Sequence, residues 1–243
     1  MGNAIRNVAA SSRPKQNRKY SIIIPAAGLS SRMKKYGPQS LIKINNNTLL
    51  DRQIKTIDKV FRWYEIILVG GFEFDKLTRH VPSKVKLIEN KEYLETTIIH
   101  SINLGLNQCQ TENILIMYGD LIFNNIAITA PFDNESIAII SNDMKTSDVG
   151  CTINNNYIQQ MFYGIDNKWG QIVFITKQEL SIMKTFCSNH SNHTKYGFES
   201  INYIIESGGK IKSHHAKKSI IFDIDTSLDL KKTRMKYENS NSK

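Results

Sequence analysis

Short apolar runs alternate with segments of helical periodicity through the first half of this chain. Four such runs have the pattern of strands that are buried on both faces: residues 20–26, 65–71, 84–90 and 113–120. Between them, residues 48–61 and 96–108 carry apolar side chains at helical spacing, and Thr48 is a residue suited to the N-cap. Strands that alternate with helices build βαβ units, in which the strands run parallel and the crossovers are right-handed. We therefore predict an α/β fold with a mostly parallel central sheet.

The second half of the chain carries shorter and more closely spaced strand patterns. Four β-rich segments follow one another at short intervals: residues 136–141, 149–153, 157–163 and 170–176. Short connections favour antiparallel pairing, because parallel neighbours need a long crossover. Two helical patterns, a strand pattern and a last helical pattern complete the chain: residues 177–186, 196–209, 219–225 and 226–237. We expect Gly208 to end the second helix, and Thr226 with Asp229 to cap the last one.

Residues 19–235 contain no internal repeat and no linker, so we predict one domain over this range. The pattern indicates a single Rossmann-like domain of three layers, with a mixed, mostly parallel sheet and an antiparallel, β-rich second half. Residues 1–18 are polar and aperiodic, and we predict a disordered basic arm there. Residues 236–243 are predicted to form a flexible tail.

The net charge of +10 suits phosphate-bearing ligands as well as nucleic acid. Much of the excess lies at the two ends of the chain, and the interleaved aromatic and basic pattern of nucleic-acid-binding modules is absent. The three cysteines are scattered, and no apolar run approaches the ~18 residues that a membrane helix needs. We therefore expect a cytoplasmic protein that binds neither nucleic acid nor membrane. Its oligomeric state stays open, with a homodimer among the alternatives.

The segment PAAGLSSR at residues 25–32 follows the first predicted strand and has the composition of a phosphate-binding turn. Ligands of open α/β sheets bind beyond the carboxyl ends of the strands, and the N–H groups of a glycine-containing turn that starts a helix bind anions. Arg32 adds a planar fork for phosphate oxygens. The spacing fits neither the P-loop nor the dinucleotide-binding glycine motif. The residues predicted to hold phosphate through the backbone are Ala26, Ala27, Gly28, Leu29, Ser30 and Ser31.

The longer segment PAAGLSSRM…GPQSLIKI, which ends at residue 44, resembles the signature of nucleotidyltransferases with a GT-A-like fold. This group includes the MobA-like molybdenum-cofactor guanylyltransferases, the sugar-phosphate nucleotidyltransferases and the small-alcohol-phosphate cytidylyltransferases. Three further segments resemble its motifs, in the same order: NKEYLETTIIHSINLGL, LIMYGD and FDIDTSLDL. The resemblance covers about residues 20–235. Among the three classes, the chain most resembles the small-alcohol-phosphate cytidylyltransferases.

The resemblance implies a catalytic set of Arg32, Asp120 and Asp225. The two acids are implied as ligands of Mg²⁺, a hard cation that prefers carboxylate and phosphate oxygens. Asp223 is a rival for the second acid, because residues two apart on a strand point to the same face. The sequence does not decide between Asp223 and Asp225.

The same resemblance places Thr96 and Ser101 at the nucleotide, with Asn90 and Tyr93 in matching positions. Gln39 is a departure from the pattern, because the group has a lysine after this proline and that lysine neutralises the triphosphate. Gln39 remains a predicted nucleotide contact, and the effect of its missing charge is open.

The implied reaction joins an NMP moiety from an NTP to a small phosphomonoester and releases pyrophosphate. The compact length resembles that of the cytidylyltransferases for small phosphorylated alcohols or amides, and this resemblance implies CTP and an acceptor of that class as substrates. A sugar-1-phosphate uridylyl- or thymidylyltransferase is the alternative enzyme, and a catalytically impaired nucleotide-binding homologue is the alternative without turnover.

The segment CSNHSNH at residues 187–193 contains three potential zinc ligands, Cys187, His190 and His193. Structural zinc sites usually close with four ligands, and the serine and asparagine residues between these three are typical of a flexible loop. We therefore predict a loop without zinc.

Overall fold

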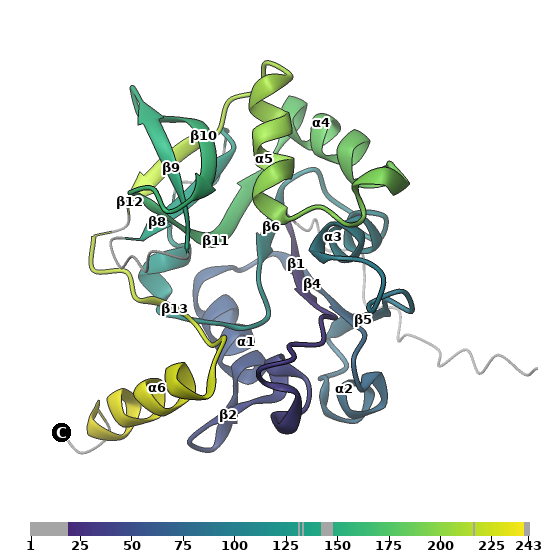
Figure 1. Cartoon of the computed structure of the whole chain (residues 1–243), viewed down its shortest axis with the longest axis vertical. Coiled ribbons are helices and arrows are strands. Elements are labelled where there is room, and N and C mark those ends of the chain that lie inside the picture. The colour runs from purple at the N-terminus through teal and green to yellow at the C-terminus, as the bar shows by residue number, and fades with distance from the viewer. Residues whose placement is uncertain (1–18, 131, 133, 142–147, 216, 241–243) are drawn as a thin grey trace, which may run out of the picture.

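The computed structural model describes residues 19–130, 132, 134–141, 148–215 and 217–240, so the predicted arm and residues 241–243 lie outside it. Nine strands form one mixed sheet in the order β5–β4–β1–β6–β11–β8–β12–β10–β9 (Figure 1). Their bounds are β1 (Tyr20–Ala26), β4 (Tyr64–Gly70), β5 (Val85–Glu89), β6 (Ile114–Met117), β8 (Ile137–Ser141), β9 (Val149–Asn154), β10 (Tyr157–Tyr163), β11 (Lys168–Ile175) and β12 (Lys212–His215). The α-helices of this part of the chain are α1 (Leu49–Val60), α2 (Phe74–His80), α3 (Ile98–Leu106), α4 (Lys177–Ser188), α5 (Gly197–Glu206) and α6 (Ser227–Ser240).

The first half of the sheet is parallel, as its sequence pattern predicts. β1 pairs in parallel with β4 on one side and with β6 on the other, and β4 pairs in parallel with β5. Ile22 therefore lies opposite Ile66 and Leu115, in the middle of three buried strands. The predicted α/β class is confirmed.

The second half is mostly antiparallel, which confirms the prediction from strand spacing. β11 runs antiparallel to both β6 and β8, and β9 and β10 form an antiparallel hairpin. β12 was not predicted, and it pairs in parallel with β8. Its sequence, KSHH, has no apolar alternation, so no local pattern marks it as a strand.

Alternating residues of β1 separate two hydrophobic layers. Ile22 and Ile24 belong to the cluster that packs against α1, whereas Ile23 belongs to the cluster formed with α3, α4 and α5. Side chains alternate across a strand, so a strand with helices on both sides is apolar throughout. This arrangement confirms the predicted three-layer domain.

A third, smaller apolar cluster joins the opening segment to the end of the chain. Met33 and Ile42 pack in it with Ile224 and Leu230. Two short sheets lie beside it: β2 (Lys43–Ile44) with β3 (Asn47–Thr48), and β7 (Leu121–Phe123) with β13 (Ile221–Asp223). The cluster therefore brings the segment after Arg32 close to the segment that carries Asp223 and Asp225.

The helix ends follow from local side chains. Thr48 accepts from the Asp51 N–H and donates its own N–H to the Asp51 carboxylate, both at 3.0 Å, and this capping box begins α1. Thr226 and Asp229 make the same reciprocal bonds at the start of α6, and Gly208 follows α5 with a φ of +86°. α6 continues to Ser240, into the segment predicted as a tail. None of the described helices is long and apolar enough to span a membrane.

Candidate functional site

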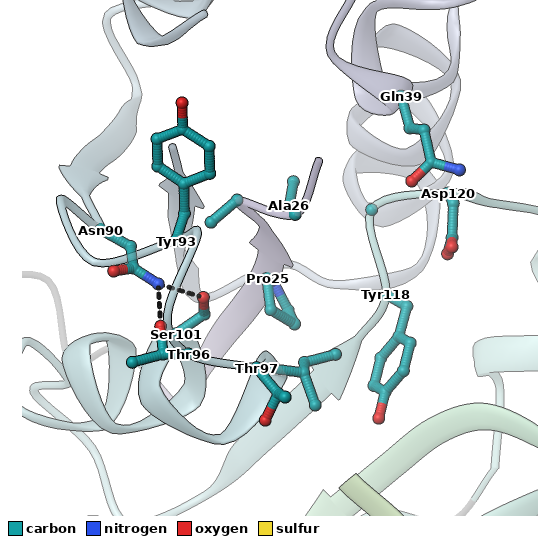
Figure 2. Close-up of a pocket in the computed structure, with 14 residues that line it drawn as sticks. Pro25, Ala26, Gln39, Asn90, Tyr93, Thr96, Thr97, Ser101, Tyr118 and Asp120 are labelled. Carbon is teal, nitrogen blue, oxygen red and sulfur yellow. Dashed lines mark hydrogen bonds between the residues drawn. The ribbon is translucent and has the colours of Figure 1, made fainter. Parts of the chain in front are cut away.

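A cavity of about 160 Å³ opens beyond the carboxyl ends of β1, β5 and β6 (Figure 2). One wall comes from the end of β1 and from the strand end at Gly119, another from the loop after β5 and the start of α3. Gly119 allows the two strand ends to meet, because an added Cβ would lie 2.6 Å from the Cβ of Ala26. Seven predicted site residues line this cavity: Ala26, Ala27, Gly28, Gln39, Thr96, Ser101 and Asp120.

Leu29, Ser30, Ser31 and Arg32 do not line the cavity but continue the loop away from it. The prediction of a helix start after this turn was wrong. The turn leads into the short 3₁₀ helix η1 (Lys34–Tyr36), because Met33 packs into the small apolar cluster instead of continuing a helix. Within the described residues of this turn, no α-helix therefore begins.

The backbone of the turn is nevertheless available to a ligand. In the part of the chain that the structure describes, the N–H groups of Gly28, Leu29, Ser30 and Ser31 donate to no other protein group. Gly28 does not need its conformational freedom, since its φ is not positive, and an added Cβ would meet nothing within 4 Å. The absent side chain keeps the space above the turn open. Unpaired N–H groups around open space are suited to phosphate oxygens.

Asn90, directly after β5, organises the opposite wall of the cavity. Its buried amide donates to the hydroxyls of Thr96 at 3.3 Å and Ser101 at 3.1 Å, and its oxygen accepts from the Glu92 N–H at 2.9 Å (Figure 2). Thr96 also donates to the Glu92 carbonyl at 2.7 Å, so its hydroxyl already holds the loop together. The Ser101 proton finds no acceptor among the described residues, so Ser101 is the better ligand contact of the two.

Asp120 lies just beyond β6, between Gly119 and β7. Its Oδ1 is buried and has no hydrogen-bond partner within the described residues. Burial raises the pKa of the Asp120 carboxyl to about 7, and the nearby Asp225 and Asp223 carboxylates add to the rise. The Ile224 N–H donates to the Asp120 carbonyl at 3.2 Å, which holds the acids of the two segments near one another. A cation would relieve both the burial cost and the repulsion.

The two rival acids have different partners. Asp223 ends β13, is buried, and lies 3.6 Å from the ammonium of Lys168, which lies 3.1 Å from Asp148. Asp225 is beyond the strand and partly exposed, and the Arg32 guanidinium lies 3.8 Å from it. β13 ends at Asp223. The argument that Asp223 and Asp225 point to the same face of a strand therefore does not apply, because Asp225 is not part of the strand. The buried Lys168, which the sequence did not single out, already balances Asp223.

Gln39 lies in the short helix η2 (Gln39–Leu41), across the cavity from Asn90 (Figure 2). Its amide donates to the Ile224 carbonyl at 3.1 Å. The residue that replaces the group's lysine thus links the cavity to the segment that carries Asp225.

Aromatic residues close the side of the cavity nearest β11. Tyr118 lines the cavity and makes an edge-to-face contact with Trp169, with ring centroids 5.6 Å apart. A Cβ on Gly197 would lie 1.9 Å from the Tyr118 hydroxyl, so only glycine fits at the start of α5. Beyond them, the rings of Tyr163 and Phe198 pack 5.3 Å apart. Sequence patterns did not identify Tyr118 as part of the site, because its position at the end of an apolar run is typical of a buried strand residue.

Comparisons with known proteins agree with this geometry. Residues 22–138 match the MobA-like NTP transferase domain family. The bifunctional protein GlmU of Alkaliphilus metalliredigens is 31% identical over 103 residues, which are 42% of this chain and 22% of that protein, so the chain spans about a fifth of this curated relative.

Solved structures share the fold across nearly the whole domain. The CTP:phosphocholine cytidylyltransferase of Streptococcus pneumoniae superposes with a TM-score of 0.74 at 16% identity, over 90% of this chain and 99% of the other. The inositol-1-phosphate CTP transferase of T. maritima gives 0.72 at 17% identity, over 90% and 96%. A UDP-glucose pyrophosphorylase complexed with UDP-glucose gives 0.73 at 13% identity, over 92% and 99%. The predicted resemblance and the GT-A-like fold class are confirmed.

Proposed function

We propose that this chain, which carries a MobA-like NTP transferase domain over residues 22–138, transfers an NMP moiety from an NTP to a small phosphomonoester and releases pyrophosphate. The observation that carries the proposal is the unpartnered, buried oxygen of Asp120 beside the cavity, with Asp225 and Arg32 close by. A buried acid of raised pKa in a cleft is typical of a functional site.

The acid set fits a divalent cation. Asp120 has a bare buried oxygen, and a second carboxylate, Asp225, contributes to its raised pKa. Mg²⁺ takes oxygen ligands and is commonly held by one or two carboxylates together with substrate phosphates. Asp120 and Asp225 would hold it, and when bound it would supply positive charge to the phosphates of the NTP.

The remaining residues would position two anions for one displacement. A phosphate oxygen of the acceptor forms a bond to the α-phosphorus of the NTP, and the bond to pyrophosphate breaks with its electron pair on the leaving group. An ionised phosphate monoester needs no general base, so positioning and charge balance carry the catalysis. In this proposal the unpaired N–H groups of Gly28 to Ser31 and the Arg32 guanidinium would hold the triphosphate, and Ser101 would hold the nucleoside.

We favour CTP and a small phosphorylated alcohol or amide as substrates. The support is that the chain covers 99% of the phosphocholine cytidylyltransferase and 96% of the inositol-1-phosphate CTP transferase. The comparable likeness to a UDP-glucose pyrophosphorylase keeps a sugar-1-phosphate uridylyl- or thymidylyltransferase as the second candidate. Tyr118, Trp169 and the Tyr163–Phe198 pair would form the acceptor side of the site.

A pyrophosphate-release screen tests the proposal. The purified protein is incubated with Mg²⁺, each of ATP, GTP, CTP, UTP and dTTP, and a panel of phosphocholine, inositol-1-phosphate and glucose-1-phosphate, with Asp120→Asn as the blank. Turnover with CTP and a phosphorylated alcohol supports the favoured substrates. Turnover with UTP or dTTP and glucose-1-phosphate selects the second candidate. NTP binding without any turnover would identify an impaired homologue and overturn the enzymatic proposal.

A further inference from the structure

A cluster of Glu92, His100 and His193 lies behind the loop that forms one wall of the cavity. One potential ligand atom of each residue lies within 4.8 Å of the others. The carboxylate of Glu92 is 3.8 Å from the His100 Nε2, and the rings of His100 and His193 are 4.4 Å apart. We propose that these three side chains form a binding site for a divalent transition metal of the zinc type, separate from the acids of the nucleotide site.

The hydrogen bonds of His193 leave it in the form that binds metals. Its Nε2 lies 3.0 Å from the Cys187 carbonyl oxygen. A carbonyl oxygen only accepts, so Nε2 carries the proton and Nδ1 keeps its lone pair. Metal-binding histidines commonly donate their other ring N–H to a backbone carbonyl in this way.

His100 supplies a second, independent observation. Its Nδ1 is buried and has no hydrogen-bond partner within the described part of the chain. Its other ring nitrogen, Nε2, is the one that lies 3.8 Å from the Glu92 carboxylate, so within the described residues no hydrogen bond fixes this ring in a purely structural role.

The ligand chemistry selects the metal. Two imidazoles and one carboxylate suit zinc and its transition-metal neighbours, whereas Mg²⁺ prefers oxygen ligands alone. Tetrahedral ligands at about 2.0–2.1 Å from zinc lie about 3.3 Å apart, so ligand atoms that lie within 4.8 Å of one another would have to draw closer by up to about 1.5 Å, which the exposed Glu92 side chain can do by changing rotamer. The ring of His190 lies 4.6 Å from that of His193 and is the nearest candidate for a fourth ligand, with water as the alternative.

This set differs from the three ligands that the sequence brings together. The Cys187 side chain is buried in the apolar cluster formed with α3, α4 and α5, and its carbonyl, not its thiol, meets His193. Cys187 contributes its carbonyl instead. In the folded chain, the residues that lie beside His193 as potential metal ligands are Glu92 and His100, which are about ninety residues earlier in the sequence.

The position of the cluster couples it to the cavity wall. The N–H and hydroxyl of Thr97 both donate to the His193 carbonyl, at 2.7 and 3.0 Å, and Thr97 lines the cavity. At the other end of the loop, the Glu92 carbonyl accepts from the Thr96 N–H at 3.0 Å. A metal bound by Glu92 and His193 would therefore hold both ends of this wall.

The test is metal binding by the full-length protein after treatment with a chelator and desalting. Isothermal titration with Zn²⁺ should show one site per chain, and Co²⁺ should give the intense ligand-field absorption of a four-coordinate site. Glu92 is largely exposed, so Glu92→Gln should fold normally and should weaken Zn²⁺ binding at least tenfold. His100→Gln should abolish the site.

Two variants serve as matched controls. His215→Asn removes an exposed histidine at the end of β12, and Asp120→Asn disables the nucleotide-site acid. Both should bind Zn²⁺ as the wild type does, and Zn²⁺ should raise the melting temperature of these variants but not that of Glu92→Gln. Equal Zn²⁺ affinity in Glu92→Gln and His100→Gln, loss of binding in Asp120→Asn, or no binding to the wild type would overturn the proposal. None of these readouts depends on enzymatic turnover.

Discussion

The side-chain amide of Gln39 donates a 3.1 Å hydrogen bond to the backbone carbonyl of Ile224, a residue 185 positions further along the chain. Ile224 stands between the two acids Asp223 and Asp225, and its N–H bonds the Asp120 carbonyl. One bond thus joins the opening motif to the C-terminal motif.

We expect Gln39→Lys to keep activity. A lysine ammonium can donate to the same carbonyl, and an added cation near a triphosphate should lower the KM for NTP more than it changes kcat. Gln39→Met, which has a similar size and no donor, should lose the bond, worth about 0.5–1.5 kcal/mol. Steady-state kinetics of the two variants check this. A tenfold or larger fall in kcat/KM for Gln39→Lys would show that the amide has a role that lysine cannot fill.

Asp120→Asn and Asp225→Asn should each lower turnover by at least about 100-fold, because each replaces a carboxylate that we propose as a ligand of Mg²⁺ with a neutral amide. Asp223→Asn should act differently, since it unbalances the buried Lys168 and should cost about 3 kcal/mol of folding stability. Urea titrations and pyrophosphate-release rates separate the two effects. Near-normal rates for Asp225→Asn, with loss of activity in a folded Asp223→Asn, would exchange the roles of the two acids.

Asp120 should destabilise the metal-free protein at high pH. Its pKa rises from 3.8 to about 7 on folding, so the folded state binds more protons than the unfolded chain between these values. The contribution of Asp120 to stability therefore falls as the pH rises from about 4 to 7, and stays low above that.

In EDTA at pH 8, Asp120→Asn should consequently melt above the wild type, by at least the ~2–4 °C that one kcal/mol produces in a chain of this size. At pH 4 the difference should vanish. Calorimetry at the two pH values measures it, and a variant that melts below the wild type at pH 8 would contradict the burial argument.

Arg32→Ala should weaken NTP binding by about 1.5–3 kcal/mol, the worth of a charge-assisted contact. It should hardly change the melting temperature, because the Arg32–Asp225 pair is exposed and such pairs contribute little. Arg62→Ala, which removes an arginine packed on Trp63, is the matched control for loss of positive charge. Calorimetric NTP titrations that do not distinguish the two variants would place Arg32 outside the binding site.

The sequence by itself predicted the parallel first half, the antiparallel hairpin of the second and the caps of α1 and α6. These features are local, because burial periodicity and a capping pair such as Thr48 and Asp51 are determined by a few neighbouring residues. It also placed Gly28 and Asp120 at strand ends, where α/β sheets bind their ligands.

Only the tertiary structure decided which distant side chains meet. It paired Asp223 with Lys168 and Asp225 with Arg32, it made Asn90 the hydrogen-bond centre for Ser101, and it brought His100 to His193. It also showed the polar strand β12 and the missing helix after the turn. Such contacts depend on the packing of segments that are far apart in the sequence. The identity of a residue does not determine which distant residue will contact it in the folded chain.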